Sequence, residues 1–254
     1  MNPLITSPQN ERIKRMKQLH KKKGRVQSNS FLIEGFHLIE EAYAAKWNIQ
    51  TVVVREEVRV PSFLQGENVL RVSERVFDSL AQTNSPQGII AVVEMKTYSF
   101  IDTPLTLIID AVQDPGNIGT MIRSADAAGF GLVILGEGCA DLYNDKVIRS
   151  TQGSMFHVPV LQMKLEDAYK ELRMRGTNIV ATALEGAVDY TKMITDEKMA
   201  LLVGNEGAGV HQQYIDMADQ IVKIPIYGQA ESLNVSIAAS ILMYDMKRKI
   251  ASVS

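Results

Sequence analysis

Five short apolar runs within residues 105–226 constrain the fold of this chain more than any other feature. They read "LTLII", "GLVILG", "NIVATAL", "MALLVG" and "QIVKIPI", and mostly helical segments separate them. Strands that are apolar throughout, without alternation, are typical of a parallel sheet that helices cover on both faces. The pattern therefore predicts a C-terminal α/β domain built on a parallel sheet.

A smaller α/β domain is predicted before this sheet. Between residues 31 and 93, short β-branched runs alternate with helical periodicity. The polar stretch "EMKTYSFIDTP" that follows has weak periodicity and ends in a turn signal. We therefore expect residues 1–95 to form a basic arm and the small domain, residues 96–104 a linker, and residues 105–254 the larger domain.

The charge of the chain is unevenly distributed. The formal net charge is only −2, yet residues 1–25 carry eight Lys and Arg side chains and a single acidic residue, Glu11. A cationic segment of this kind attracts polyanions and releases their counterions, which favours nucleic-acid binding. A solvated helix face is the alternative explanation.

Several classes of protein are disfavoured by the sequence. No apolar run approaches the roughly 20 residues of a membrane span, and the first residues lack the apolar core of a secretory signal. Cys139 is the single cysteine and cannot form an intramolecular disulfide, so we expect a cytoplasmic protein. The histidines lack metal-ligand spacing, so no metal site is predicted; they are His20, His37, His157 and His211. No Walker A sequence or G-x-G-x-x-G fingerprint is present, which disfavours P-loop enzymes and dehydrogenases.

Three glycine-rich loops follow the most apolar runs. They are "DPGNIG" at residues 114–119, "GNEGAG" at 204–209 and "YGQAESLN" at 227–234. In open parallel sheets, ligands bind beyond the carboxyl ends of the strands, and glycines let the backbone approach them closely. The sequence therefore predicts a ligand site at this edge of the sheet.

Each polar residue near these loops also has a simpler explanation. Asn117 and Asn234 stand where helix N-caps are expected. Arg123 could be an exposed position of a helix that is otherwise apolar on one side. That buried side would consist of Ile118, Met121, Ile122 and Ala125. Only the convergence of the three loops on one edge favours function over structure.

The loop sequences also resemble a known family when they are taken together. "DPGNIGTMIRSADAAGF", "LLVGNEGAGV" and "IPIYGQAESLNVSIAASILMYD" resemble, in order and spacing, the motifs of the SpoU (TrmH-like) branch of the SPOUT methyltransferases, and the match covers residues 105–250. "VIRSTQGSMFHVPV" is similar to the stretch between the first two motifs, although "STQGS" departs from the family pattern. "FLIEGFHLIEEA" and "NSPQGIIAVV" resemble the small substrate-binding domain that is similar to ribosomal protein L30e.

This resemblance implies an activity and a fold. The activity is S-adenosylmethionine-dependent 2′-O-methylation of a ribose in RNA, most simply 23S ribosomal RNA, without a metal. The fold is an L30e-like α/β domain followed by a SPOUT parallel sheet with a deep trefoil knot, in a homodimer. A transfer RNA substrate and a non-catalytic RNA-binding protein are the alternatives. Small residues would allow close backbone crossings in the knot, namely Gly119, Ser124, Ala127 and Gly207.

The resemblance also assigns roles to residues. Arg123 matches the catalytic arginine of the family. The polar active-site positions correspond to Asn117, Glu206, Ser232 and Asn234. The residues expected to contact S-adenosylmethionine are Gly204, Ile224 and Leu233, with Thr182, Ala183 and Leu184 as a further wall. Because a guanidinium stays protonated in proteins, Arg123 suits stabilisation of alkoxide charge and a grip on phosphate better than it suits general-base catalysis.

Overall fold

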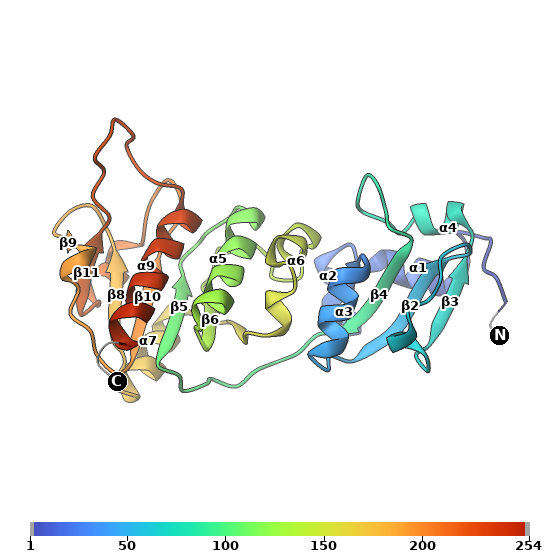
Figure 1. The fold of residues 1–254 in the computed structure, drawn as a ribbon, viewed down its shortest axis with the longest axis horizontal. Coiled ribbons are helices and arrows are strands. Elements are labelled where there is room, and N and C mark those ends of the chain that lie inside the picture. Colours follow the sequence, from blue (N-terminus) through green and yellow to red (C-terminus); the bar gives the residue numbers. More distant parts are fainter. Residues whose placement is uncertain (1–2, 252–254) are drawn as a thin grey trace. The chain divides into compact units, whose positions relative to one another are not determined.

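The computed structural model of the protein describes residues 3–251, which form two compact units (Figure 1). The first unit comprises residues 3–96 and 141–156, and the second comprises residues 97–140 and 157–251. The sequence analysis had expected residues 105–254 to form one continuous domain. Residues 141–156 group with the first unit, because aromatic side chains of this segment contact Phe31 and Trp47 there.

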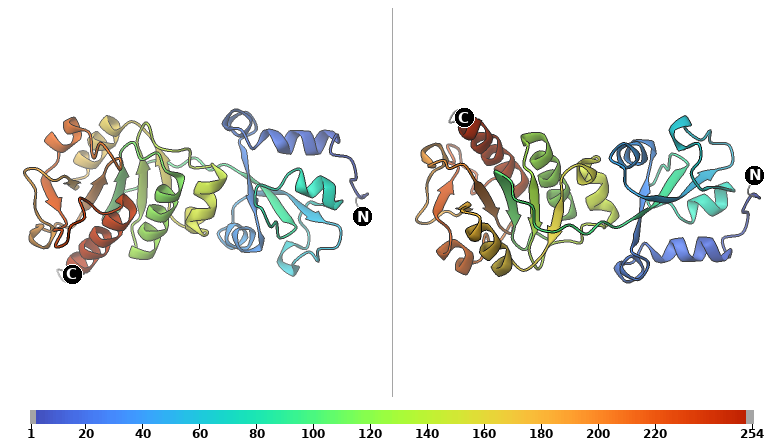
Figure 2. Two further views of the ribbon diagram at one scale, coloured as in Figure 1. Left: turned by 90° about the horizontal axis from the view of Figure 1, so that it is seen from above. Right: turned by 90° about the horizontal axis from the view of Figure 1, so that it is seen from below.

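The first unit is built on a mixed sheet. Its strands are β1 (Ser30–Glu34), β2 (Ile49–Arg55), β3 (Val69–Val72) and β4 (Ile89–Glu94). They lie in the order β1-β4-β2-β3, and β2 and β3 form a parallel pair while the other pairs are antiparallel. Helices α1 (Glu11–Gln18) and α4 (Glu74–Asp78) pack on one face, and α3 (Phe36–Ala44) packs on the opposite face (Figure 2).

The basic N-terminal segment is helical. Asn10 begins α1, since its side chain accepts a hydrogen bond from the Arg12 backbone nitrogen at 2.9 Å. Ile13 and Met16 are buried on α1. A second helix, α2 (Lys22–Ser28), places Arg25 in the interior with only 6% of its surface exposed.

Arg25 is therefore a structural residue. Its guanidinium donates to the carbonyl oxygens of Leu19 and His20 at 2.9 and 3.1 Å, and it pairs with the Asp141 carboxylate at 2.5 Å. Burial of a charge is tolerated when such partners replace water. Arg25 is thus not one of the charges of the basic segment that a nucleic acid can reach.

The segment 141–156 also explains the "STQGS" stretch. It contains α6 (Asp145–Thr151) and a 3₁₀ turn, η2 (Ser154–Phe156). Gly153 adopts a φ of +97°, and a Cβ there would lie 2.7 Å from the Glu41 side chain.

The end of the segment is bonded to the first unit, where the Trp47 indole nitrogen donates to the Phe156 carbonyl at 3.1 Å. Thr151 and Ser154 are buried. Packing in the first unit therefore accounts for this sequence.

The second unit is built on a parallel sheet. Its strands are β5 (Leu105–Ile109), β6 (Leu132–Leu135), β7 (Val160–Gln162), β8 (Asn178–Thr182), β9 (Val188–Asp189), β10 (Met199–Val203) and β11 (Gln220–Lys223). Within the described residues the order is β7-β6-β5-β10-β8-β11-β9, and every pair is parallel. The five apolar runs correspond to β5, β6, β8, β10 and β11, so the predicted sheet is confirmed. The edge strands β7 and β9 went unpredicted because each is too short to show a pattern.

Helices cover both faces of this sheet, as predicted. Helices α5 (Pro115–Ala128) and α9 (Val235–Ala251) lie together on one face, and α7 (Leu165–Met174) and α8 (Gln212–Asp216) lie on the other (Figure 2). The Ser240 hydroxyl donates to the Ser124 hydroxyl at 2.8 Å, which joins α9 to α5. Within residues 3–251, no helix is long and apolar enough to cross a membrane.

The close backbone approach in this unit occurs at Gly204. A Cβ on this residue would lie 2.2 Å from the carbonyl carbon of Gly209, so no other residue fits without a shift. Gly207, which had been expected to serve a backbone crossing, meets only the Asn205 side chain, at 3.6 Å. The expectation for Gly207 is therefore wrong, and the trefoil knot stays a prediction.

Candidate active site

The three glycine-rich loops meet at one edge of the parallel sheet. Strands β5, β10, β8 and β11 are neighbours, with Val203 opposite Ile109 and Leu202 opposite Ala181. Because these strands are parallel and end in register, the segments that follow them emerge at the same edge. The edge therefore collects polar side chains from distant parts of the chain.

A chain of hydrogen bonds joins the three loops. The Asn117 side-chain nitrogen donates to Glu206 Oε1 at 2.7 Å. The Asn234 side-chain nitrogen donates to Asn117 Oδ1 at 3.0 Å. The Asn117 amide is thus fixed at both ends, with its orientation set by the two neighbouring loops.

The capping roles of the two asparagines differ. Asp114, not Asn117, is the N-cap of α5, since its carboxylate accepts from the Asn117 backbone nitrogen at 2.8 Å, and Pro115 occupies the first turn. Asn234 does act at the start of α9, where Oδ1 accepts from the Ser236 backbone nitrogen at 2.9 Å. The capping explanation is therefore wrong for Asn117 and correct for Asn234, whose amide nitrogen also serves the site.

Asn205, which precedes Glu206, builds the middle loop. Its Oδ1 accepts from the backbone nitrogens of Gly207 and Ala208 at 2.9 and 3.2 Å. Its backbone exchanges two 2.9 Å hydrogen bonds with Gly209. Its side-chain nitrogen donates to the Ala111 carbonyl at 3.0 Å, just after β5. This loop therefore holds Glu206 at its tip and ties it to the first loop.

The buried carboxylate of Asp110 holds the start of α8 beside the end of β5. Asp110 follows β5, and only 3% of its side chain is exposed. It accepts from the His211 backbone nitrogen at 2.8 Å, and its Oδ2 also lies 2.8 Å from His211 Nδ1. Since a buried carboxylate requires such partners, this pair anchors the start of α8 beside β5. No local sequence pattern predicts this pair, because its members stand 101 positions apart.

Arg123 and Ser232 stay outside the hydrogen-bond chain. Arg123 is exposed on α5, on the side opposite the predicted buried residues of that helix. Within residues 3–251 neither the Arg123 guanidinium nor the Ser232 hydroxyl has a hydrogen-bond partner. Arg123 lies about 9 Å along the helix from Asn117. Its charge therefore remains available to a ligand.

The residues expected to hold S-adenosylmethionine surround the same edge. Thr182 ends β8, Gly204 follows β10 and Ile224 follows β11. Leu184 and Leu233 are 69% and 37% exposed although both are apolar. Apolar side chains beside a close-packed glycine backbone fit an adenosine group, whose rings are flat and whose edges hydrogen-bond to main-chain groups. The apolar side chains and the glycine backbone at this edge therefore suit the cofactor.

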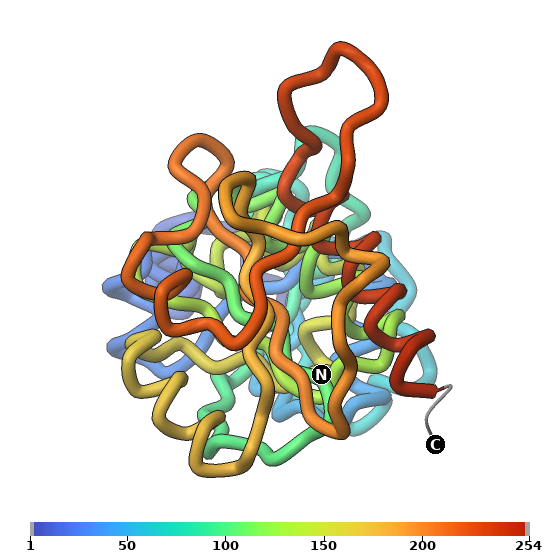
Figure 3. Tube along the Cα trace, turned by 90° about the vertical axis from the view of Figure 1, so that its left-hand side faces the viewer, coloured from blue at the N-terminus to red at the C-terminus, as the bar shows by residue number. Residues whose placement is uncertain are grey.

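The last of the three loops extends away from the sheet. Figure 3 shows the segment between β11 and α9 as a loop that projects from the second unit. Tyr227, within it, is 93% exposed. The loop carries Ser232 and Leu233 and leads to Asn234, whose side chain is bonded to Asn117.

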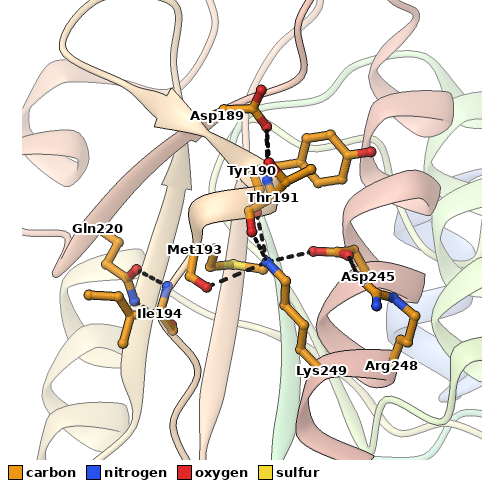
Figure 4. A network of polar contacts seen from close by, with 9 residues as sticks. All are labelled: Asp189, Tyr190, Thr191, Met193, Ile194, Gln220, Asp245, Arg248 and Lys249. Atoms are coloured by element: carbon orange, nitrogen blue, oxygen red, sulfur yellow. Dashed lines mark hydrogen bonds and ion pairs between the residues drawn. The ribbon is translucent and has the colours of Figure 1, made fainter. Parts of the chain in front are cut away.

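A lysine network holds the segment that follows the cofactor wall (Figure 4). Lys249, on α9, donates from Nζ to the carbonyl oxygens of Tyr190 and Thr191 at 2.9 and 3.0 Å. Its ammonium lies 3.0 Å from Asp245 Oδ2, and Asp245 is buried. Hydrogen bonds from Thr191 also lower the pKa of Asp189 at the end of β9. The sequence analysis missed this network because its parts belong to different elements.

Cys139 lies beside the end of β5. Its thiol donates to the Ile109 carbonyl at 3.3 Å. Burial raises the pKa of this thiol to about 11. A neutral thiol is a poor nucleophile, so Cys139 is a structural residue of the sheet edge.

Two family models match the chain. The SpoU rRNA methylase family matches residues 104–244, and an MRM3-like substrate-binding domain matches residues 10–91. The first match covers the parallel sheet with its loops, and the second covers the mixed sheet of the first unit.

Individual relatives match nearly the whole chain. A 23S rRNA (guanosine(2553)-2′-O)-methyltransferase of Bacillus subtilis is 45% identical over 96% of this chain and 98% of its own. The structure of an S-adenosylmethionine-bound rRNA methyltransferase from Sinorhizobium meliloti covers 98% of both chains, with a TM-score of 0.89 at 33% identity. The SpoU methyltransferase AviRb of Streptomyces viridochromogenes, also with the cofactor, covers 96% of this chain and 99% of its own, with a TM-score of 0.85 at 28% identity.

Proposed function

Because this chain belongs to the SpoU rRNA methylase family, we propose that it methylates the 2′-hydroxyl of a guanosine in 23S ribosomal RNA. The chain is an S-adenosylmethionine-dependent RNA 2′-O-methyltransferase. The relative that is 45% identical acts on a guanosine of 23S rRNA and matches over both units. This full-length likeness supports the same class of nucleotide as the substrate here.

The hydrogen-bond chain from Glu206 through Asn117 to Asn234 is the observation in the structure that carries the proposal. S-adenosylmethionine supplies a methyl group on an electrophilic sulfonium. The protein must then hold the ribose hydroxyl in line with that methyl, and such positioning accounts for much of the rate enhancement of reactions of this kind. A fixed amide beside a carboxylate offers the hydroxyl both a donor and an acceptor.

Arg123 is proposed to stabilise the charge that develops on the ribose oxygen. Its guanidinium keeps its proton and has no partner within the described residues. Because negative charge on the ribose oxygen is greater in the transition state than in the bound substrate, a nearby cation stabilises the transition state more and lowers the barrier. The phosphate next to the reacting ribose is the natural second ligand of the same side chain, because guanidinium and phosphate form paired hydrogen bonds.

A homodimer belongs to the same proposal. Ile237, Ile241 and Tyr244 stand at helical spacing on α9 and are 50%, 37% and 55% exposed. An apolar stripe of this kind on a helix is typical of an interface. The cytoplasm, expected from the single cysteine, is the proposed compartment.

The test is methyl transfer from labelled S-adenosylmethionine to ribosomal RNA taken from cells that lack the protein. Incorporation at a single 2′-O-methylguanosine of 23S rRNA is the expected result, with calorimetric binding of the cofactor as the control. Cofactor binding without transfer to any RNA would contradict catalysis. Transfer to transfer RNA alone would contradict the proposed substrate, and an absence of cofactor binding would favour a non-catalytic RNA-binding protein.

A further inference from the structure

A polar groove opens in the first unit beneath helix α1. Its volume is about 440 Å³, and it is lined by residues of α1 and its C-terminal end, by the last residue of α2, and by residues of β1, β2, β4 and β3 with the turn that precedes β3. This volume is within the range of sites that bind small organic groups. The groove is not part of the candidate methyl-transfer site, because every residue that lines it lies within residues 12–92 of the first unit.

Two arginines form the rim of the groove. Arg12 and Arg15 stand three positions apart on α1, on the same side of the helix, and both are exposed. Within residues 3–251, neither guanidinium has an ion-pair partner, whereas Lys14 on the same helix pairs with Glu11 at 3.0 Å. Two unpaired guanidiniums at one rim favour a ligand with neighbouring anionic groups, such as consecutive phosphates.

The wall of the groove offers the hydrogen-bonding groups that a base edge requires. The Asn68 side-chain nitrogen donates to Thr51 Oγ1 at 3.1 Å, and Gln50 Oε1 accepts from the Ser30 hydroxyl at 3.0 Å. Within the described residues, these bonds leave Asn68 Oδ1 without a donor and the Gln50 amide nitrogen without an acceptor. One free acceptor and one free donor therefore line the groove side by side.

The floor of the groove is apolar. Met16, Leu70 and Val92 line it and are buried. The apolar floor suits the flat face of a base, and the polar wall suits its hydrogen-bonding edge. The cationic rim suits the phosphates of the nucleotide. Bases inside an RNA duplex cannot enter such a hollow, whereas bases in loops and bulges are splayed out and recognised in this way.

We infer that this groove binds an unpaired nucleotide of the RNA substrate, with its flanking phosphates on Arg12 and Arg15. The inference rests on the proposed function for the identity of the RNA, and it adds a contact site in the first unit. An acidic peptide would suit the rim but would leave the free amide groups and the apolar floor unused.

The test compares RNA binding by two charge variants of the full-length protein. Arg12→Gln with Arg15→Gln removes the rim, and Lys22→Gln with Lys23→Gln removes two exposed charges from α2, outside the groove. The probe is a labelled single-stranded RNA of about ten nucleotides, measured by fluorescence anisotropy beside a duplex of equal length. We expect the rim variant to bind the single strand about tenfold more weakly, with the salt slope reduced by about 1.4 for two lost phosphate contacts.

The α2 variant is expected to lose much less affinity for the single strand. Equal losses in the two variants would overturn the inference, because they would indicate general attraction to a polyanion. Equal competition by polyglutamate and by unlabelled RNA would overturn it as well.

A neutral variant tests the groove without a change of charge. Asn68→Trp fills the hollow while both arginines remain, and Gln65→Trp places the same side chain outside it. Only the first is expected to weaken single-strand binding, and wild-type affinity in Asn68→Trp would overturn the inference.

Methyl-transfer assays of the same variants separate the two proposals. If the groove serves the substrate, the rim variant raises the KM for RNA while kcat and cofactor affinity stay unchanged. An unchanged KM in an active enzyme would overturn the inference and leave the proposed function intact. A lack of transfer by the wild-type protein, with the binding differences preserved, would contradict the proposed function instead.

Discussion

Asn117 donates a 2.7 Å hydrogen bond from its side-chain amide to the carboxylate of Glu206, which stands 89 positions later in the chain. The bond links the loop after β5 to the loop after β10 at the carboxyl edge of the parallel sheet. Asn234 completes the arrangement from the third loop. The polar part of the candidate site is therefore held together by the protein's own side chains, which would lower the cost of orienting a ribose there.

Asn117→Ala is expected to lower the rate of methyl transfer by about a hundredfold, because the loss of both side-chain bonds frees Glu206 and Asn234 to move. Asn117→Asp keeps the shape but cannot donate to Glu206, so it should be equally impaired. Methyl incorporation under single-turnover conditions measures the effect, and calorimetric cofactor affinity within about threefold of wild type is the control. Near-normal turnover in Asn117→Asp would contradict the role of the bond.

Arg123→Ala is expected to fold normally and to bind the cofactor while activity falls by about a hundredfold or more. Arg123 is exposed on α5, so the change in unfolding free energy should stay within about 0.5 kcal/mol. Arg123→Lys keeps the charge without the paired geometry and should recover part of the activity. Unchanged methyl incorporation by Arg123→Ala would remove Arg123 from the mechanism.

Asp110→Ala is expected to destabilise the protein by about 1–3 kcal/mol, since the His211 backbone nitrogen loses its acceptor. His211→Ala should cost less, because the backbone bond at 2.8 Å persists and the His211 side chain is 60% exposed. Urea denaturation of the two variants gives the comparison. A cost for His211→Ala equal to that for Asp110→Ala would show that the ring, not the backbone nitrogen, is the important partner.

Lys249→Met is expected to lower the free energy of unfolding by about 1–3 kcal/mol, because the buried Asp245 carboxylate would keep only the exposed Arg248 guanidinium as a cationic partner. The carbonyl oxygens of Tyr190 and Thr191 would lose their donor as well. Lys247→Met, an exposed neighbour on α9, is the matched control and should have little effect. Equal stabilities of the two variants would contradict a structural role for the lysine network.

Cys139 is expected to resist thiol reagents in the folded protein, since its pKa is raised to about 11 from an ordinary value of 9.0. At a pH of about 8, labelling should be slow in buffer and fast in denaturant. Above pH 9.0 the unfolded chain loses this proton while the folded chain retains it, so the free energy of unfolding falls as the pH rises towards about 11. Rapid labelling of the native protein, or a pH dependence that Cys139→Ser leaves unchanged, would contradict this assignment.

The sequence alone determined the parallel sheet, its cover of helices and the edge that carries the site. Runs such as "LTLII" and "MALLVG" indicate burial on both faces, because nearly all residues of a doubly covered strand are apolar. The ordered motifs also indicated the family and its chemistry. These features depend on residues close together in the chain, and local patterns are sufficient to specify them.

Only the tertiary structure decided which side chains meet. It assigned the cap of α5 to Asp114 and left the Asn117 side chain for the candidate site, and it buried Arg25, one charge of the basic segment, against Asp141. It also placed residues 141–156 in the first unit. For Asn117 and Arg25 the physical reason is the same: their partners, Glu206 and Asp141, stand 89 and 116 positions away, and the packing of the sheets, which no local pattern encodes, brings them together.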